Sequence, residues 1–355
     1  MNKPASYPAI PSLDGFRALS ILIVALSHAG FGDIVPGGLG VTIFFFLSGY
    51  LISTLLLQEY AGAGSINIRH FYLRRILRLY PPLLVTLVVA YGLVYAGKLG
   101  GQTSFAGLMA QLFYFANFYQ LFIAGGNSVP HGTGILWSLA VEEHFYLVYP
   151  LVFLGLVRLR SMRVAVSLLA LCCVFALLWR WHLVDRPGFD AARTYYATDT
   201  RFDSILFGCI LAFLRRESWR EPPQSRMSIG QWSLLAAGVA GIAVSLLYRA
   251  EAFRETLRYT LQGVSLMPIF HYAIANARNG VFKPLNLAPV RRIGVYSYSI
   301  YLIHFVIFEA ITENAGVVIP PVLLLCIGFS LACAYAYLID TYVDAYFRVL
   351  RKKLH

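Results

Sequence analysis

The chain reads LDGFRALSILIVALSH over residues 13–28, an apolar run of helical length with an aspartate and an arginine near one end and a histidine at the other. The whole sequence of 355 residues is 58% hydrophobic and 13% charged. Soluble domains carry about 25% charged residues. Because the polar stretches are short and lie between apolar runs, we expect one integral membrane domain over residues 1–355 and no separate soluble domain.

Apolar segments of spanning length define the predicted architecture. A helix needs about 20 residues to cross roughly 30 Å of hydrocarbon. Eleven segments approach this length, near residues 14–33, 38–57, 79–97, 105–124, 136–157, 163–184, 200–214, 230–248, 257–275, 294–314 and 318–341. In the segment 105–124, Gln111, Asn117 and Gln120 interrupt the apolar run, and a glycine-rich loop follows. We therefore predict an all-α polytopic membrane bundle of about ten transmembrane helices, with 105–124 as a re-entrant or interfacial segment.

The charge balance indicates orientation in the membrane. The chain has 29 Lys and Arg against 17 Asp and Glu, a net charge of +12. Basic residues accumulate in cytoplasmic loops, which explains this balance better than nucleic-acid binding does. Leaving 105–124 out of the crossings places every basic loop on one side, with both termini in the cytoplasm. The five cysteines lie inside apolar runs, so we expect them to pack rather than to form disulfides.

Ionisable side chains inside spans are the first functional candidates, because each costs about 2.5–3.5 kcal/mol at the centre of a helix. Arg17 and His28 are eleven residues apart, hence on one helical face and about 16 Å apart along the axis. This run has no clear signal-peptidase site, so we expect a retained first helix. A lone histidine in an apolar helix is commonly a packing residue, and only the other charged clusters favour a catalytic base.

A second cluster opens another span, where residues 137–146 read WSLAVEEHFY. Adjacent helical residues point about 100° apart, so either Glu142 or Glu143 faces the bundle interior. Tyr146 lies on the Glu142 side. The two carboxylates either stabilise a helix N-terminus or include one that orients an imidazole base.

A third cluster is basic, and residues 69–82 read RHFYLRRILRLYPP. Arg74 and Arg78 are four residues apart and share a helical face. Such a face suits bidentate binding of phosphate. Plain anchoring against anionic lipid explains the same spacing equally well.

The remaining ionisable groups favour structural interpretations. Residues 199–203 read DTRFD, where Arg201 can pair with either carboxylate, and we expect a structural ion pair. His304 is expected to pack or to support the site. No His-Glu-x-x-His spacing indicates a metal, and no glycine-rich nucleotide motif is present.

Taken in order along residues 10–345, these motifs together resemble the acyltransferase 3 family, whose members O-acylate bacterial surface glycans. The matching segments are residues 13–17 with His28, 44–50, 74–81, 137–143, 201–203 and 298–304. The resemblance implies a ten-helix bundle that takes an acyl group, most often acetyl from cytoplasmic acetyl-CoA, and delivers it to a carbohydrate hydroxyl. It also implies the bacterial cytoplasmic membrane as the location.

By the same resemblance, Arg17 and His28 correspond to the paired arginine and histidine of the family, and Glu142 or Glu143 to its acidic residue. Arg74, Arg75 and Arg78 correspond to its acyl-CoA-binding basic motif. The chain departs from the family at Asp340 and His144, so no role is carried over to them. An esterase-like domain that some members carry is not expected here.

These observations predict an O-acyltransferase in which His28 is the general base, a proton relay or a nucleophile. Glu142 would orient or charge-balance its imidazole, and Arg17 would bind anionic groups or stabilise the oxyanion. The expected supporting residues are Asp14, Ser48, Trp137, Ser138, Glu143, Tyr146, Arg201, Asp203, Tyr301 and His304.

The expected partners are the bilayer, a glycan or other hydroxyl acceptor, and acyl-CoA as co-substrate rather than as a bound cofactor. The alternative is a transporter or flippase with a buried Arg, His and Glu pathway. That class is typically built from inverted repeats, and the sequence has no convincing internal symmetry of this kind.

Overall fold

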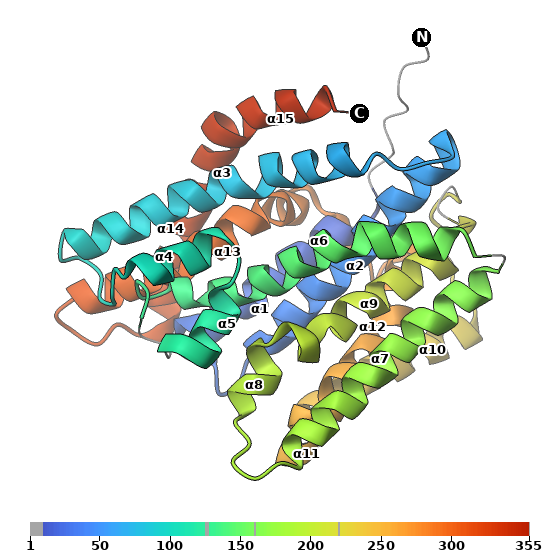
Figure 1. Ribbon diagram of the computed structural model, residues 1–355, viewed down its shortest axis with the longest axis horizontal. Coiled ribbons are helices and arrows are strands. Elements are labelled where there is room, and N and C mark those ends of the chain that lie inside the picture. Colours follow the sequence, from blue (N-terminus) through green and yellow to red (C-terminus); the bar gives the residue numbers. More distant parts are fainter. Residues whose placement is uncertain (1–9, 125–127, 160, 219–220, 355) are drawn as a thin grey trace.

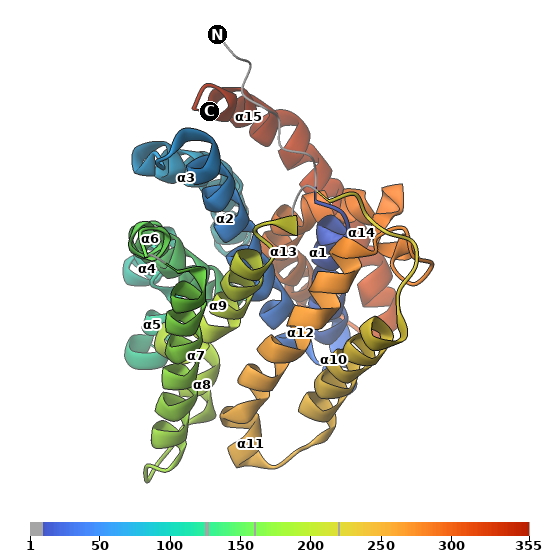
Figure 2. The same cartoon turned by 90° about the vertical axis from the view of Figure 1, so that its right-hand side faces the viewer.

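The computed structural model describes residues 10–354 except 125–127, 160 and 219–220. The described part is helical, and its only β pairing is an isolated bridge between Gly101 and Pro130. Eight helices in this part are long and apolar enough to cross a membrane. Figures 1 and 2 show the long helices packed side by side in one bundle. The chain is an integral membrane protein, as its composition predicts.

In the described part of the chain, ten long helices occupy the ten segments predicted to span. They are α1 (Leu13–Leu26), α2 (Gly37–Ala63), α3 (Ile68–Tyr95), α6 (Trp137–Val157), α7 (Met162–Val184), α9 (Thr198–Leu214), α10 (Ile229–Leu247), α12 (Leu257–Ala275), α13 (Ala288–Asn314) and α14 (Pro321–Leu338). Eight of them are the helices that are long and apolar enough to cross a membrane, and α9 and α12 are the other two. Helix α9 is the shorter of the two, with 17 residues, most of them buried.

Short elements connect the long helices. They are α4 (Phe105–Leu112), α5 (Ala116–Tyr119), α8 (Ala191–Tyr196), α11 (Glu251–Glu255) and α15 (Ala345–Lys352), the 3-10 turns η3 (Thr133–Leu136) and η5 (Lys283–Asn286), and the π-helical turns η1 (Ser27–Phe31), η2 (Gln120–Ala124) and η6 (Ile339–Asp344). The segment 105–124 is divided among α4, α5 and η2, each far too short to cross hydrocarbon. Its exclusion from the spans is therefore confirmed.

Two glycines bring the backbones of α2 and α9 into contact (Figure 1). A methyl carbon added at Gly49 would lie 1.9 Å from the carbonyl oxygen of Ile205, and one added at Gly208 would lie 2.0 Å from that of Phe46. Small residues permit this close approach, which gains van der Waals contact where lipid offers no hydrophobic drive. The reciprocal pair fixes α2 next to α9 in the centre of the bundle.

Helix α1 packs against α13 in the same way. A methyl carbon at Gly294 of α13 would lie 1.8 Å from the carbonyl oxygen of Asp14, and one at Gly15 would lie 2.2 Å from that of Leu285, in the turn η5 that precedes α13. The first turns of α1, which carry Arg17, are thereby pressed against α13. This contact places the charged first turns of α1 beside the pocket described below.

We predict that Gly208→Ala lowers the melting temperature of the detergent-solubilised protein by several degrees. The added carbon has no space, and overpacking costs about 1–3 kcal/mol. The matched control is Gly155→Ala on α6, where an added carbon has no neighbour within 4 Å. Thermal unfolding followed by fluorescence-detected size exclusion measures both variants. Equal melting temperatures for the two would contradict the close contact between α2 and α9.

Candidate active site

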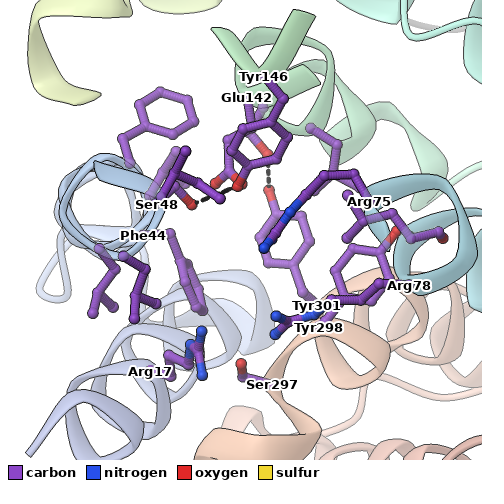
Figure 3. Close-up of a pocket in the computed structure, with 18 of the residues that line it drawn as sticks. Arg17, Phe44, Ser48, Arg75, Arg78, Glu142, Tyr146, Ser297, Tyr298 and Tyr301 are labelled. Carbon is purple, nitrogen blue, oxygen red and sulfur yellow. Dashed lines mark hydrogen bonds between the residues drawn. The ribbon is translucent and has the colours of Figure 1, made fainter. Parts of the chain in front are cut away.

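A pocket opens between α1, α2, α3, α6 and α13, with about 930 Å³ of space free of protein atoms, part of it open to solvent. Figure 3 shows its polar side chains converging from these five helices. They are Arg17, Ser48, Arg75, Arg78, Ser138, Glu142, Tyr146, Ser297, Tyr298 and Tyr301. Apolar side chains such as Phe44 and Leu51 complete the wall. Predominantly apolar walls with a few convergent polar groups are typical of small-molecule sites.

Of the predicted site residues, those that line the pocket are Arg17, Ser48, Arg75, Arg78, Ser138, Glu142, Tyr146 and Tyr301. Those that lie outside it are Asp14, His28, Arg74, Trp137, Glu143, Arg201, Asp203 and His304. The pocket is also lined by Phe44, Ser297 and Tyr298, which the sequence analysis did not predict as site residues. Helical spacing was the signal available for them, because Ser297 and Tyr298 precede Tyr301 by four and three residues, and Phe44 precedes Ser48 by four.

Glu142 is the carboxylate that faces the pocket. Its Oε2 accepts hydrogen bonds from the hydroxyls of Ser48 and Tyr146, both at 2.9 Å, and the two hydroxyl oxygens lie 3.0 Å apart. Tyr146 stands one helical turn after Glu142 on α6, whereas Ser48 comes from α2. The side chain is therefore held by two helices, and the neighbouring Glu143 does not line the pocket. This separates the two carboxylates that sequence alone left equivalent.

The arginines of α3 differ in their partners. Arg74 donates to Glu59 at 2.9 Å and to the carbonyl of Leu354, which ties it to the end of α2 and to the chain after α15. Among the described residues, no carboxylate lies within ion-pair distance of Arg75 or Arg78. Arg74 therefore does not line the pocket, because Glu59 engages it, and its role in phosphate binding stays a prediction.

Arg75 is half-buried and has no ion-pair partner among the described residues. Its guanidinium lies 5.7 Å from the ring centroids of both Phe71 and Tyr146, and its Nε has no hydrogen-bond partner. Arg17, on the facing helix, pairs with Asp14 at 2.9 Å. The pocket therefore carries three guanidinium groups on facing helices, and two of them, those of Arg75 and Arg78, have no carboxylate within ion-pair distance among the described residues. Such a surface is suited to an anion with several charges.

His28 lies outside this pocket, in the π-helical turn η1 at the end of α1. The turn contains Gly30 at φ 108°, a backbone conformation that favours glycine. The His28 Nδ1 lies 2.9 Å from Nε2 of His304, whose own Nδ1 lies 2.8 Å from the carbonyl oxygen of Tyr301. Among the described residues, His28 is thus oriented by His304, and the expectation that Glu142 orients it is wrong. Glu142 is engaged with Ser48 and Tyr146 instead.

Tyr301 stands between the pocket and the two histidines. It lines the pocket, and its ring centroid is 5.7 Å from that of His304 and 5.9 Å from that of Phe44. Its hydroxyl lies 2.7 Å from that of Ser138, close to the carbonyl of Ile135. Arg17 and Glu142 therefore line the pocket, whereas His28 and His304 lie outside it, with the His304 ring against that of Tyr301.

The fourth predicted cluster is structural, with different partners from those expected. Asp203 pairs with Arg180 of α7 at 2.7 Å, and both side chains are fully buried. Asp199 pairs with Arg193. Arg201 pairs with neither carboxylate, because its guanidinium lies 4.1 Å from the ring centroid of Tyr259 in a group of aromatic rings that also contains Trp137. The predicted pairing of Arg201 with a carboxylate is therefore wrong.

One group of metal-ligand type lies apart from the pocket. Single ligand atoms of His131, Glu309 and Glu313 come within 4.8 Å of one another. The His131 Nδ1 lies 2.6 Å from Glu313, which also accepts from the amide of Gly100 at 2.6 Å. These bonds join two loops to the end of α13. Sequence spacing gave no sign of the group, because His131 is far from the two glutamates along the chain.

A family model, described as an acyltransferase domain, matches residues 10–341. The chain belongs to the acyltransferase 3 family. This family assignment makes the pocket and the adjacent histidines a candidate acyl-transfer site.

Two similar relatives carry related names. The peptidoglycan O-acetyltransferase OatA of Listeria monocytogenes is 32% identical over 324 residues, which cover 88% of this chain and 51% of that protein. The O-acetyltransferase OatA of Staphylococcus aureus is 31% identical over 316 residues, covering 86% and 51%. The chain thus spans about half the length of these relatives. No solved structure matches the chain.

We predict that Asp203→Asn lowers stability by about 3–5 kcal/mol, because it leaves the buried Arg180 without a counter-charge. The matched control is Asp199→Asn, which weakens a partly exposed pair and should cost at most about 1 kcal/mol. Thermal unfolding in detergent measures both. If Asp203→Asn unfolds at the wild-type temperature, Asp203 is not a structural residue.

Proposed function

We propose that this chain is a membrane O-acetyltransferase that takes acetyl from acetyl-CoA in the cytoplasm and passes it to a hydroxyl of a surface polysaccharide or lipid-linked glycan. The observation that carries the proposal is that Arg75 and Arg78 line the pocket and have no carboxylate within ion-pair distance among the described residues. The names of the relatives make peptidoglycan the first acceptor to test.

The donor is bound by the pocket. The Arg75 and Arg78 guanidiniums hold the CoA phosphates through charge-assisted, bidentate hydrogen bonds. Arg17 adds a third positive charge on the facing helix (Figure 3). The apolar wall formed by Phe44 and Leu51 accommodates the pantetheine arm. The thioester then lies at the Tyr301 end of the pocket, away from the phosphates.

In the proposed reaction, the donor in the pocket meets the acceptor and His28 near Tyr301. The acceptor hydroxyl attacks the acetyl carbon while His28 takes its proton. The new carbon–oxygen bond replaces the carbon–sulfur bond, and the protonated His28 returns the proton to the leaving CoA sulfur. Arg17 stands about three helical turns from His28, so it binds the donor rather than the oxyanion at the acetyl carbon.

The proposed orientation in the membrane follows from the distance between Arg17 and His28 along α1. Both termini and the arginine end of the pocket face the bacterial cytoplasm, where acetyl-CoA is made. His28 lies at the opposite end of α1, so the acceptor approaches from the outer side. The enzyme thereby moves an acetyl group across the bacterial cytoplasmic membrane while CoA stays inside.

We predict that purified wild-type protein consumes acetyl-CoA in nanodiscs and that His28→Ala reduces this turnover at least about 100-fold, the lower range for loss of a general base. Release of free CoA thiol measures the rate, and size exclusion checks folding. Glu142→Gln tests whether the carboxylate held by Ser48 and Tyr146 also contributes. Full activity of His28→Ala would exclude it as the base, and a wild type without acetyl-CoA turnover would favour the transporter alternative.

We predict that the double variant Arg75→Gln with Arg78→Gln raises the Kd for CoA at least about tenfold, because each charge-assisted bond contributes roughly 1.5–3 kcal/mol. Arg74→Gln is the matched control on the same helix, and it should change the Kd less than about threefold because Glu59 already engages Arg74. Calorimetric titration of CoA measures all of them. An equal loss in the control would indicate plain surface electrostatics rather than a phosphate site.

A further inference from the structure

The contact between His28 and His304 determines which ring nitrogens carry hydrogen. Nδ1 of His304 lies 2.8 Å from the carbonyl oxygen of Tyr301 and 3.2 Å from that of Ile300. A carbonyl oxygen only accepts hydrogen bonds, so this Nδ1 carries the hydrogen. The remaining question for His304 is whether its Nε2 is protonated as well.

Burial answers that question. The His304 side chain is fully buried, and its ring neighbours are His28, Tyr301, Phe305 and Phe308. Among the described residues, no carboxylate pairs with it. A buried imidazolium without a counter-charge is costly, so His304 is neutral and its Nε2 has a free lone pair. That lone pair faces Nδ1 of His28 at 2.9 Å.

We infer that His304 is the positioning residue of the site, and that it holds His28 in the tautomer with hydrogen on Nδ1. Nε2 of His28 is then the nitrogen that accepts a proton. No described residue hydrogen-bonds to this atom, and the His28 side chain is only partly buried. Neutral imidazole in water favours hydrogen on Nε2, so the protein must impose the opposite tautomer.

The ring of His28 is also held in place from its flat side. It stacks on Phe305 with centroids 4.2 Å apart, and it lies nearly parallel to His304, with an angle of 8° between the planes. The stacking partner and the hydrogen-bond partner both come from α13, whereas His28 comes from the π-helical turn after α1. Two helices thus fix both the direction and the tautomer of one imidazole.

This inference deepens the proposed function and rests on it for the chemistry. The Nε2 of His28 accepts the hydroxyl proton as the acceptor oxygen bonds to the acetyl carbon, and the imidazolium then gives this proton to the CoA sulfur. Throughout, Nδ1 keeps its hydrogen and its bond to His304. A carboxylate is therefore not needed to orient the base, which fits the engagement of Glu142 elsewhere.

The first test compares two substitutions of His304 in nanodiscs. His304→Gln can still accept from Nδ1 of His28 through its amide oxygen, whereas His304→Phe cannot. We expect His304→Phe to lose at least about tenfold in acetyl-CoA turnover, since a wrong tautomer can cost up to roughly 10⁴-fold. We expect His304→Gln to stay within about fivefold of wild type. The remote exposed His182→Phe serves as a control and should leave turnover unchanged.

The second test reads the tautomer directly and does not depend on turnover. Nitrogen NMR of ¹⁵N-histidine-labelled protein distinguishes ring nitrogens that carry hydrogen from those that do not. The signals of His28 are identified because they disappear in His28→Ala. We expect hydrogen on Nδ1 of His28 in wild type and in His304→Gln, and on Nε2 in His304→Phe. Hydrogen on Nε2 in wild type, or equal turnover in the Gln and Phe variants, would overturn the inference. Absence of acetyl-CoA turnover in wild type with the expected tautomer would instead contradict the proposed function alone.

Discussion

The cost of placing charge in hydrocarbon is the constraint on which the rest of this structure depends. The bundle meets it in two ways. Arg180 and Asp203 neutralise each other with no exposure to solvent, and Arg201 lies over aromatic rings. Arg75 and Arg78 line a pocket and have no carboxylate within ion-pair distance in the described part of the chain, although the Arg75 guanidinium also lies 5.7 Å from the ring centroids of Phe71 and Tyr146. The lack of an ion-pair partner for these two arginines supports the proposal that an anionic ligand binds beside them.

The helix contacts explain why the pocket and the histidines adjoin each other. Glycines let α2 touch α9 and let α1 touch α13, so that the pocket walls have fixed positions. Helix α13 carries both Tyr301, on the pocket wall, and His304, which contacts His28 outside the pocket. A donor held by arginines and an acceptor approaching His28 would therefore meet at one residue. This arrangement suits transfer of a small group across a membrane while the carrier stays behind.

The sequence predicted the helices better than it predicted the partners within the site. Apolar length identified the spans, and polar residues in 105–124 identified the segment that does not cross. The pairing of His28 with His304 joins positions 276 residues apart, and Arg180 lay unnoticed in an apolar run. Hydropathy determines that a helix is inserted but not how it rotates about its axis, and rotation decides which faces meet. The sequence therefore cannot show that Glu142 bonds to Ser48 rather than to His28.

The most direct test of the account is a cryo-EM structure of the protein in nanodiscs with a non-hydrolysable acetyl-CoA analogue. We expect the phosphates against Arg75 and Arg78, and the acetyl carbonyl at the Tyr301 end of the pocket, facing His28. Density for CoA elsewhere on the protein, or in this pocket with the acetyl group directed away from Tyr301, would contradict it.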